Sequence, residues 1–199
     1  FHMNGTVFAL VLPAAVQTVA DEQCGTLIDF LDQNIVCRGE QVAIDYVMVE
    51  YTADGSENSA AEFYEKMEYS AAKAYSQKHR YIRYQPEMGE ELARARYLQE
   101  RMQTIDKEHG FEVWFQPIKC LHDKVFCSME ALIRLREPNG SMISPAEFIP
   151  LAEKTGHINS ITWFVITEVC DALKNTPELA NVSVSVNLPM EQLLEKSFI

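Results

Sequence analysis

Alternation of apolar and polar residues predicts a strand in "KVFCSMEALIRLR", Lys124 to Arg136. One face of this strand is wholly apolar and holds Val125, Cys127, Met129, Ala131, Ile133 and Leu135. The opposite face carries two charges, Glu130 and Arg134, which lie roughly 13 Å apart in a strand and cannot pair with each other. Either Glu130 binds a cation and Arg134 binds an anion, or both pair with neighbouring side chains in an ordinary salt-bridge network. Spacing alone favours the salt-bridge network.

The first part of the chain reads as strand, helix, strand, helix, strand. "TVFALVLP" predicts a strand closed by Pro13, and residues 14–34 carry apolar positions at helical spacing. "VAIDYVMVEY", residues 42–51, predicts a second strand. Ser59 and Glu62 have the spacing of a capping box at the head of a helix to about Gln77, and "YIRY" is a short strand. The pattern predicts an α/β unit with a thin core.

The second part begins with a charged segment, residues 87–109, that predicts a connecting helix ended by Gly110. Two strands, "FEVWFQPIKC" and "KVFCSMEALIRLR", are expected to form a hairpin through "LHD". Ser144 is a candidate helix cap, with Pro145 at the first position and Glu147 at capping-box spacing. A helix over 159–175 precedes "NVSVSVNLP", a strand whose polar face ends in Asn187. This order suits the opening of a barrel with functional groups at strand ends.

Composition and net charge indicate which ligands, metals and cellular locations to expect. The chain has 199 residues, of which 47% are hydrophobic and 23% charged, as in globular proteins. Its net charge of -12 opposes binding to long nucleic acids but allows a small anionic ligand. The five cysteines lack metal-ligand spacing, so we expect reduced, mostly buried thiols and no structural zinc. Without a long apolar run or signal-peptide features, we expect no membrane span and a cytoplasmic location.

Four motifs stand at the spacings of one family: "FQPI", "MEALIRL", "ISPAEFIPLAEKTGHI" and "VSVNL". From about Phe111 to Ile199 the chain resembles the EAL-domain family of cyclic di-GMP phosphodiesterases. The resemblance implies an α/β fold in which residues 111–199 are the first, N-terminal half of a modified TIM barrel. Residues 87–110 would be a linker helix.

Residues 1–86 resemble the C-terminal part of a GGDEF domain, the module that makes cyclic di-GMP in active relatives. The signature is degenerate and reads Asn4-Gly5-Thr6-Val7-Phe8. Gly5 and Phe8 match, but a glycine is missing at Asn4, and Thr6 and Val7 replace two acidic residues. Because phosphoryl transfer needs carboxylates to hold magnesium, the resemblance implies a non-cyclase remnant. Its role would be regulatory or architectural, by nucleotide sensing or by packing alone.

The resemblance also implies a site. Glu130 matches a catalytic ligand of a divalent cation, Asn187 a second ligand, and Arg134 a contact to a ligand phosphate. Their oxygen donors suit Mg²⁺ or Mn²⁺. Gln116 matches a ligand-contacting position and Pro145 borders a guanine, although the glutamine could simply satisfy backbone groups and the proline start a helix.

Other conspicuous residues are given ordinary roles. We expect no catalytic role for His122 or His157, and packing roles for Trp114 and Trp163. Pro189 stands where the family commonly has a small hydroxyl residue. Pro189 either alters the hydrogen bonding that orients Asn187 or begins a helix.

The family reaction is hydrolysis of cyclic di-GMP to linear pGpG. Its remaining acidic ligands and a lysine normally follow "VSVNLP" further along the barrel. We therefore expect the parent protein to be a phosphodiesterase and residues 1–199 alone to be inactive. The alternative is a non-catalytic cyclic di-GMP receptor or protein-interaction module, and a homodimer through the EAL domain is possible.

Overall fold

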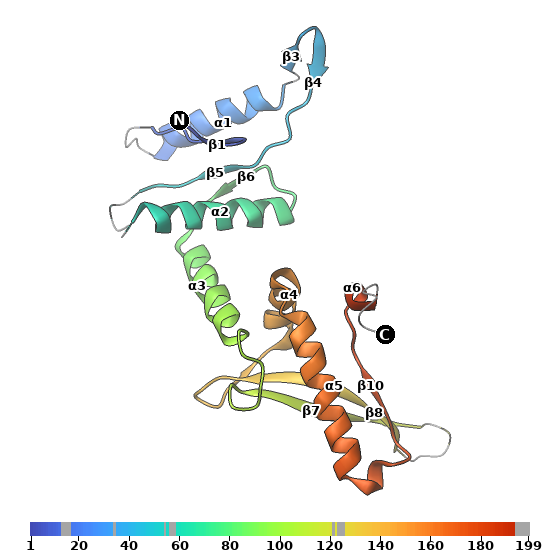
Figure 1. The fold of residues 1–199 in the computed structure, drawn as a ribbon. Coiled ribbons are helices and arrows are strands. Elements are labelled where there is room, and N and C mark those ends of the chain that lie inside the picture. Colours follow the sequence, from blue (N-terminus) through green and yellow to red (C-terminus); the bar gives the residue numbers. More distant parts are fainter. Residues whose placement is uncertain are drawn as a thin grey trace. The chain divides into compact units, whose positions relative to one another are not determined.

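The computed structural model describes residues 1–12, 17–33, 35–53, 55, 59–120, 122 and 126–193. The chain divides into two units, Phe1–Tyr84 and Gln85–Ile199, called here the first and second unit. Figure 1 shows the elements of each. Within the described ranges, no helix has the length and apolar character needed to cross a bilayer.

The first unit combines two helices with three pairs of short strands (Figure 1). Its elements are β1 (His2–Asn4), β2 (Val7–Phe8), α1 (Gln17–Leu31), β3 (Ile35–Cys37), β4 (Glu40–Val42), β5 (Met48–Glu50), α2 (Ala60–Ser76) and β6 (Tyr81–Arg83). β1 and β2 form an antiparallel hairpin, as do β3 and β4, whereas β5 and β6 pair in parallel. The unit therefore has no single large sheet among its described residues.

Two predicted strands of this unit are wrong in extent. The strand expected over residues 6–13 is formed only by Val7–Phe8, and Pro13 lies outside the described residues. The strand expected over 42–51 is split, because β4 pairs with β3 while β5 pairs with β6. The β3–β4 hairpin was not predicted. Its turn places Arg38 and Gly39 at φ 52° and 88°, as two-residue hairpin turns require.

Several element predictions for this unit are confirmed. The Ser59 side chain caps α2 by accepting a hydrogen bond from the backbone N–H of Glu62 at 3.1 Å. β6 forms where "YIRY" predicts it, and α1 falls within residues 14–34. Among the described residues of the unit, only Ser70 and Ala74 are fully buried, so the core is thin.

A carboxylate with little solvent exposure joins α1 to β5 and β6. The Glu50 side chain is 10% exposed and accepts hydrogen bonds from Arg83 Nε at 3.0 Å and Nη2 at 3.1 Å. It also accepts bonds from the Tyr81 hydroxyl and, at 3.6 Å, from the Cys24 thiol on α1. Burial and the bond to Glu50 raise the pKa of Tyr81 to about 12. The cluster is thus a satisfied ionic anchor rather than an open site.

The second unit is larger and builds around one sheet (Figure 1). Its elements are α3 (Pro86–Arg101), β7 (Phe111–Lys119), β8 (Phe126–Arg136), β9 (Met142–Ile143), α4 (Pro145–Thr155), α5 (Ile158–Asn175), the 3₁₀ turn η1 (Pro177–Leu179), β10 (Ser183–Val186) and α6 (Met190–Leu193). The sheet order is β10-β8-β7, and β9 pairs with the end of β8. β7 runs antiparallel to β8, and β10 runs parallel to it. The hairpin and the later strand are as predicted; β9 was not foreseen.

Helices α4 and α5 cover the apolar face of this sheet, and α3 packs against α4. The core takes Phe111 from β7 and Ala131 and Leu135 from β8, with Val184 and Val186 of β10 packed against it. The helices supply the other side of the core: Leu98 (α3), Met102 just after α3, Phe148 and Ala152 (α4), and Ile161, Val165 and Val169 (α5). The apolar face of β8 is therefore the core face, as its alternation predicts. The opposite face of the sheet holds the polar residues.

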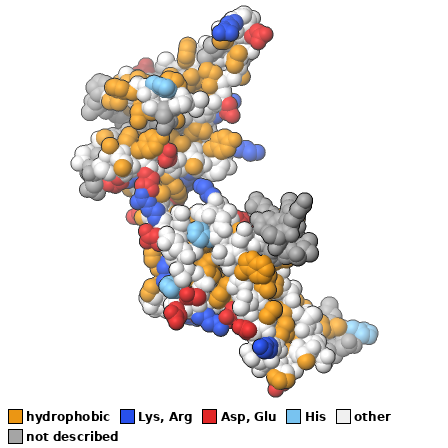
Figure 2. Space-filling view, viewed as in Figure 1, with side chains coloured by type: hydrophobic (Ala, Val, Ile, Leu, Met, Phe, Trp, Pro, Cys, Tyr) orange, Lys and Arg blue, Asp and Glu red, His pale blue; other side chains and the backbone are white. Residues whose placement is uncertain are grey.

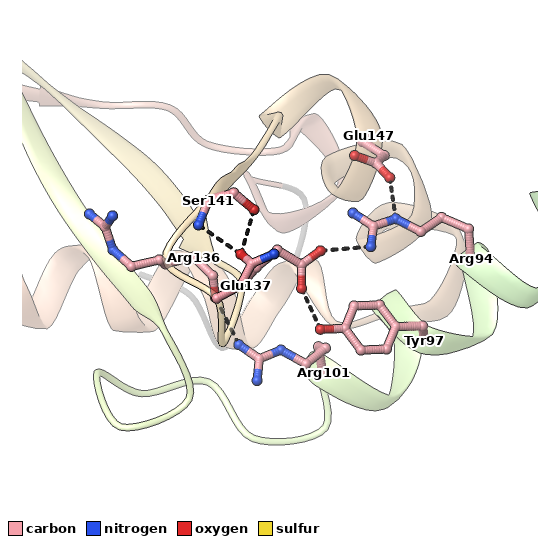
Figure 3. A network of polar contacts seen from close by, with 8 residues as sticks. Arg94, Tyr97, Arg101, Arg136, Glu137, Ser141 and Glu147 are labelled. Atoms are coloured by element: carbon pink, nitrogen blue, oxygen red, sulfur yellow. Dashed lines mark hydrogen bonds and ion pairs between the residues drawn. The ribbon is translucent and has the colours of Figure 1, made fainter.

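Helix α3 ends at Arg101 rather than near residue 109, and a polar network joins it to other elements of the second unit (Figure 3). The Glu137 carboxylate accepts a bond from Arg94 Nη1 at 2.7 Å and one from the Tyr97 hydroxyl. Burial opposes ionisation of Glu137, but these two donors outweigh it and hold its pKa below the ordinary value. Arg101 Nη2 donates to the carbonyl of Arg136 at 3.0 Å. The network ties α3 to the end of β8.

The capping box predicted at Ser144 is wrong. Ser144 is the N-cap of α4 and Pro145 its first residue, but the serine side chain makes no capping bond. The Glu147 carboxylate instead accepts a hydrogen bond from Arg94 Nε at 2.6 Å. An ion pair with a neighbouring helix has thus displaced the local interaction.

The cysteines also differ from expectation. All five are present as thiols, in agreement with the prediction of reduced cysteines. However, Cys37, Cys127 and Cys170 are exposed, and Cys24 and Cys120 are only partly buried. The prediction that they are mostly buried is therefore wrong.

Candidate functional site

The polar face of the second unit's sheet brings three strands into register. Gln116 on β7 and Ser185 on β10 both lie directly opposite Glu130 on β8. Residues opposite one another in a sheet point to the same face, so the three side chains form one row. Gln116 and Ser185 are exposed and Glu130 is half-buried. The row is accessible from the solvent side of the sheet.

Asn187 completes this row from just beyond β10. Its side-chain Nδ2 donates a hydrogen bond to Glu130 Oε1 at 2.9 Å, across 57 residues of sequence. The parallel pairing of β10 with β8 causes this contact, because it places the residue two beyond Ser185 next to the β8 carboxylate. Among the described residues, nothing else binds the amide oxygen of Asn187 or the second oxygen of Glu130. Both are the donor type that hard divalent cations prefer.

Arg134 lies on the same face, four residues along β8. Its guanidinium carbon is 5.6 Å from the centroid of the Trp114 ring, within cation–π range. One guanidinium N–H donates to the backbone carbonyl of Ile133 at 3.0 Å. Across the described ranges, neither Arg134 nor Glu130 forms an ion pair. The salt-bridge network that spacing alone favours is therefore not what these two charges face.

The carboxylate directly opposite Arg134 is engaged elsewhere. Glu112 on β7 is the register partner of Arg134. It accepts hydrogen bonds from Arg136 Nε at 2.7 Å and Nη2 at 3.1 Å, and from the Trp114 indole N–H at 2.9 Å. The bonds from Arg136 and then from Trp114 lower the pKa of Glu112 to about 2. Glu112 is thus ionised at neutral pH and forms an ion pair with Arg136.

Pro145 is not part of this cluster. It begins α4, which follows β9, and β9 pairs with Leu135 and Arg136 at the far end of β8. Five residues of strand, roughly 17 Å, separate that end from Glu130. The His157 ring, near the start of α5, shares a 2.8 Å hydrogen bond with the Thr155 hydroxyl.

The two most defined surface hollows also lie away from the row. One of about 260 Å³ is lined by Tyr97, Glu100, Arg101, Gln103, Thr104 and His109, and one of about 480 Å³ lies against α1. The row of Gln116, Glu130 and Ser185 is an open sheet face, not an enclosed pocket, within the described part of the chain.

Comparison with models of protein families assigns most of the second unit to a known family. Residues 96–199 match the model of the EAL domain. The chain belongs to the EAL-domain family. The match contains the four motifs noted in the sequence and the whole Gln116–Glu130–Asn187 row of this EAL domain.

Curated relatives are similar over different lengths. A cyclic di-GMP phosphodiesterase of Pseudomonas aeruginosa is 27% identical over 206 residues, covering 100% of this chain and 34% of that protein. The cyclic di-GMP phosphodiesterase PdeL of Escherichia coli is 31% identical over 94 residues, covering 46% of this chain and 26% of its own length. The chain thus spans about a third or less of these relatives.

Among solved structures, the chain is similar to the PaMucR phosphodiesterase in complex with c-di-GMP. The TM-score is 0.46 and the identity 28%, over 51% of this chain and 42% of that one. The FimX EAL domain from Pseudomonas aeruginosa bound to c-di-GMP gives a TM-score of 0.44 and 25% identity, over 50% and 40% of the two chains.

The sequence did not predict three features of this EAL domain. Ser185 was seen as polar, but its place opposite Glu130 depends on the register of β10. Trp114 and Trp163 were expected to pack, yet they are 48% and 53% exposed, so neither is a core residue. The Glu112–Arg136 ion pair was not predicted. Arg136 is two residues along β8 from the position opposite Glu112, and such diagonal neighbours are within reach of long side chains.

Proposed function

We propose that this chain is part of a cyclic di-GMP phosphodiesterase whose cation site includes Glu130 and Asn187. The hydrogen bond between these two side chains is the observation that carries the proposal. It joins two oxygen-bearing groups that are far apart in sequence, on a solvent-accessible sheet face, and no other described residue forms an ion pair with the carboxylate. Membership in the EAL-domain family and the activity named for the relatives support the same function.

The donor set fits a hard divalent cation, Mg²⁺ or Mn²⁺. Glu130 supplies carboxylate oxygen and Asn187 amide oxygen, and such cations favour oxygen ligands. A bound cation would neutralise phosphate charge and make an attacking water more acidic. Glu130 and Asn187 are two of the roughly six ligands such an ion takes, so further ligands would come from water, substrate or other parts of the protein.

The remaining residues would hold the substrate. Gln116, beside Glu130, offers both donor and acceptor groups to the ligand, and Arg134 offers N–H groups to a phosphate. Pro145, at the start of α4, would border a guanine. In the reaction, water adds across one P–O bond of cyclic di-GMP and leaves linear pGpG with a 5′-phosphate and a 3′-hydroxyl.

For the first unit, we propose the C-terminal part of a degenerate GGDEF domain, residues 1–86, without cyclase activity. The β1–β2 hairpin turns at Gly5, with φ 49°, at the position of the family signature. Thr6 and Val7 carry no carboxylate to hold magnesium. Residues 87–110 would link this part to the EAL domain. A cytoplasmic location and dimerisation through the EAL domain complete the proposal.

A second candidate function is a non-catalytic cyclic di-GMP receptor or protein-interaction module. This function would apply if the rest of the protein supplies no further acidic ligands, because a pair of catalytic cations needs more carboxylates than Glu130 alone. The described residues contain no group of three or more His, Cys, Asp or Glu side chains arranged to hold a metal ion. In a receptor, Gln116 and Arg134 would still bind the ligand.

The test is hydrolysis of cyclic di-GMP by the full-length protein with Mg²⁺ or Mn²⁺ and with a chelator. A phosphodiesterase forms pGpG only when the cation is present. Binding without pGpG would establish the receptor, and absence of both binding and hydrolysis would exclude both functions. The same protein supplied with GTP and Mg²⁺ should form no cyclic di-GMP, and its formation would refute the proposal for the first unit.

A further inference from the structure

Trp114 occupies an unusual position for a large aromatic residue of the second unit. It lies on the polar face of β7 and is 48% exposed. Along the strands, it lies between the position of Arg134 and the row that contains Glu130 and Gln116. Successive rows on one face are about 7 Å apart. Its ring contacts the Arg134 guanidinium and its N–H bonds Glu112. An aromatic side chain is thus placed where it touches a proposed substrate-binding residue.

The contact matters because an arginine that lies over an aromatic ring need not use its N–H donors to hold that position. A cation–π contact occupies one face of the planar group, whereas its N–H donors lie in the plane. A carboxylate partner would instead occupy those in-plane donors, in the fork geometry that a phosphate also needs. Stacking on an aromatic ring therefore holds an arginine without competing with a phosphate.

The carboxylate that would compete is held away by its other contacts. Glu112 is directly opposite Arg134, the usual position for a cross-strand ion pair. Arg136 binds it through two N–H groups, at 2.7 Å and 3.1 Å, and the Trp114 N–H adds a third bond at 2.9 Å. The same indole therefore contacts Arg134 with its ring and restrains Glu112 with its N–H.

We propose that Trp114 is a positioning residue of the phosphate site: it stacks on Arg134 and keeps Glu112 from pairing with it, so that the guanidinium edge stays open to a phosphate of cyclic di-GMP. This inference rests on the proposed function. It adds a residue outside the four motifs and assigns it an effect on substrate binding rather than on the chemical step.

The test compares Trp114→Leu, Trp114→Phe and Trp163→Leu in the full-length protein. Trp163 is a matched control because its indole is similarly exposed, at 53%, but lies on α5, which covers the opposite face of the sheet. Trp114→Leu should raise KM for cyclic di-GMP roughly three- to tenfold with kcat unchanged, the loss expected for a partly exposed cation–π contact. Trp114→Phe, which keeps an aromatic face, should stay within about twofold of the parent. Trp163→Leu should change neither constant.

Fluorescence gives a readout without ligand. The chain has two tryptophans, so Trp163→Phe leaves Trp114 as its single indole. If the full-length protein has others, they are replaced in the same way. In that background, Arg134→Gln should shift the Trp114 emission because it removes the stacked cation. An unchanged spectrum would refute the stack.

The outcomes separate this inference from the proposed function. Unchanged KM in Trp114→Leu, with an active parent protein, overturns the positioning role and leaves the function intact. Equal losses in Trp114→Leu and Trp114→Phe, accompanied by lower kcat and lower melting temperature, assign Trp114 to packing. A parent protein that neither binds nor hydrolyses cyclic di-GMP overturns both claims.

Discussion

Gly110 shows how a single residue shapes the entry to β7. It adopts φ +89°, and a Cβ added there would lie 2.5 Å from the carbonyl oxygen of Arg136 and 2.9 Å from Arg101 Nη2. The Arg136 N–H also donates to the Gly110 carbonyl at 2.8 Å. The close approach keeps Arg101 and the end of β8 together, so this glycine is required for steric as well as conformational reasons.

We therefore expect Gly110→Ala to destabilise the second unit by about 2–4 kcal/mol, from backbone strain plus the clash with a backbone oxygen. Gly140→Ala is the matched control, since Gly140 also has φ +89° but nothing lies within 4 Å of its added Cβ. The control should cost about 1–2 kcal/mol, from strain alone. Urea unfolding of both variants measures the difference, and equal costs would contradict the steric argument.

Glu112 gives a pH-dependent prediction at the same scale. Its pKa is lowered to about 2 in the folded protein by Arg136 and Trp114, from an ordinary value of 4.5. A lowered pKa stabilises the fold above the ordinary value, and the contribution is lost as pH falls toward about 2. Glu112→Gln should therefore reduce the melting temperature at pH 7 and have a smaller effect near pH 3, where part of the contribution is already lost. A pH-independent difference would show that the charge of Glu112 does not contribute.

Individual site residues were predictable to different degrees. Glu130, Asn187 and Gln116 were named from motifs; antiparallel pairing of β7 with β8 brings Gln116 to Glu130, and parallel pairing of β10 with β8 brings Asn187 there. The contacts of Arg134 were not predictable, because they depend on whether Glu112 pairs with Arg134 or with Arg136. That choice is made by side-chain geometry across two strands, which a linear pattern does not contain.

At the scale of elements, long alternating segments were predicted best. The β7–β8 hairpin and the helix over Ile158–Asn175 follow directly from period-two and helical patterns. The errors concern short elements. β9 has two residues and forms because β8 offers it an edge, and the segment 42–51 is divided by its two pairing partners. Such elements exist through tertiary pairing rather than local preference.

The network around Arg94 tests the attachment of α3. Glu137 is 14% exposed and Glu147 is 38% exposed, and both carboxylates bind Arg94. Glu137→Ala should cost about 2–3 kcal/mol, because Arg94 and Tyr97 lose a largely buried partner. Glu147→Ala removes a more exposed pair and should cost less than about 1 kcal/mol. Chemical denaturation separates the two, and the reverse order would contradict the network's role.

At the scale of the whole molecule, both units expose large apolar side chains, and in the first unit several of them lie close together in the sequence. Exposed fractions reach 74% for Phe8, 69% for Leu10 and 71% for Val11. Figure 2 shows hydrophobic side chains at the surface of this unit in the view drawn. Contiguous exposed apolar groups of this kind favour association.

Residues 1–199 expressed alone should therefore self-associate or be poorly soluble. Light scattering should show species larger than a monomer, and replacing both Leu10 and Val11 by Lys should reduce their size. A monodisperse monomer with cooperative unfolding would contradict the prediction.

The central claim is that Glu130 holds a divalent cation for hydrolysis of cyclic di-GMP. The most direct measurement is the hydrolysis rate and melting temperature of full-length Glu130→Gln. Glutamine keeps the shape and an acceptor for Asn187 but removes the charge that binds the cation, so the rate should fall by about a hundredfold or more with little change in stability. Glu168→Gln, on α5 beneath the opposite face, should hydrolyse at the parental rate. Parental activity in Glu130→Gln would contradict the assignment.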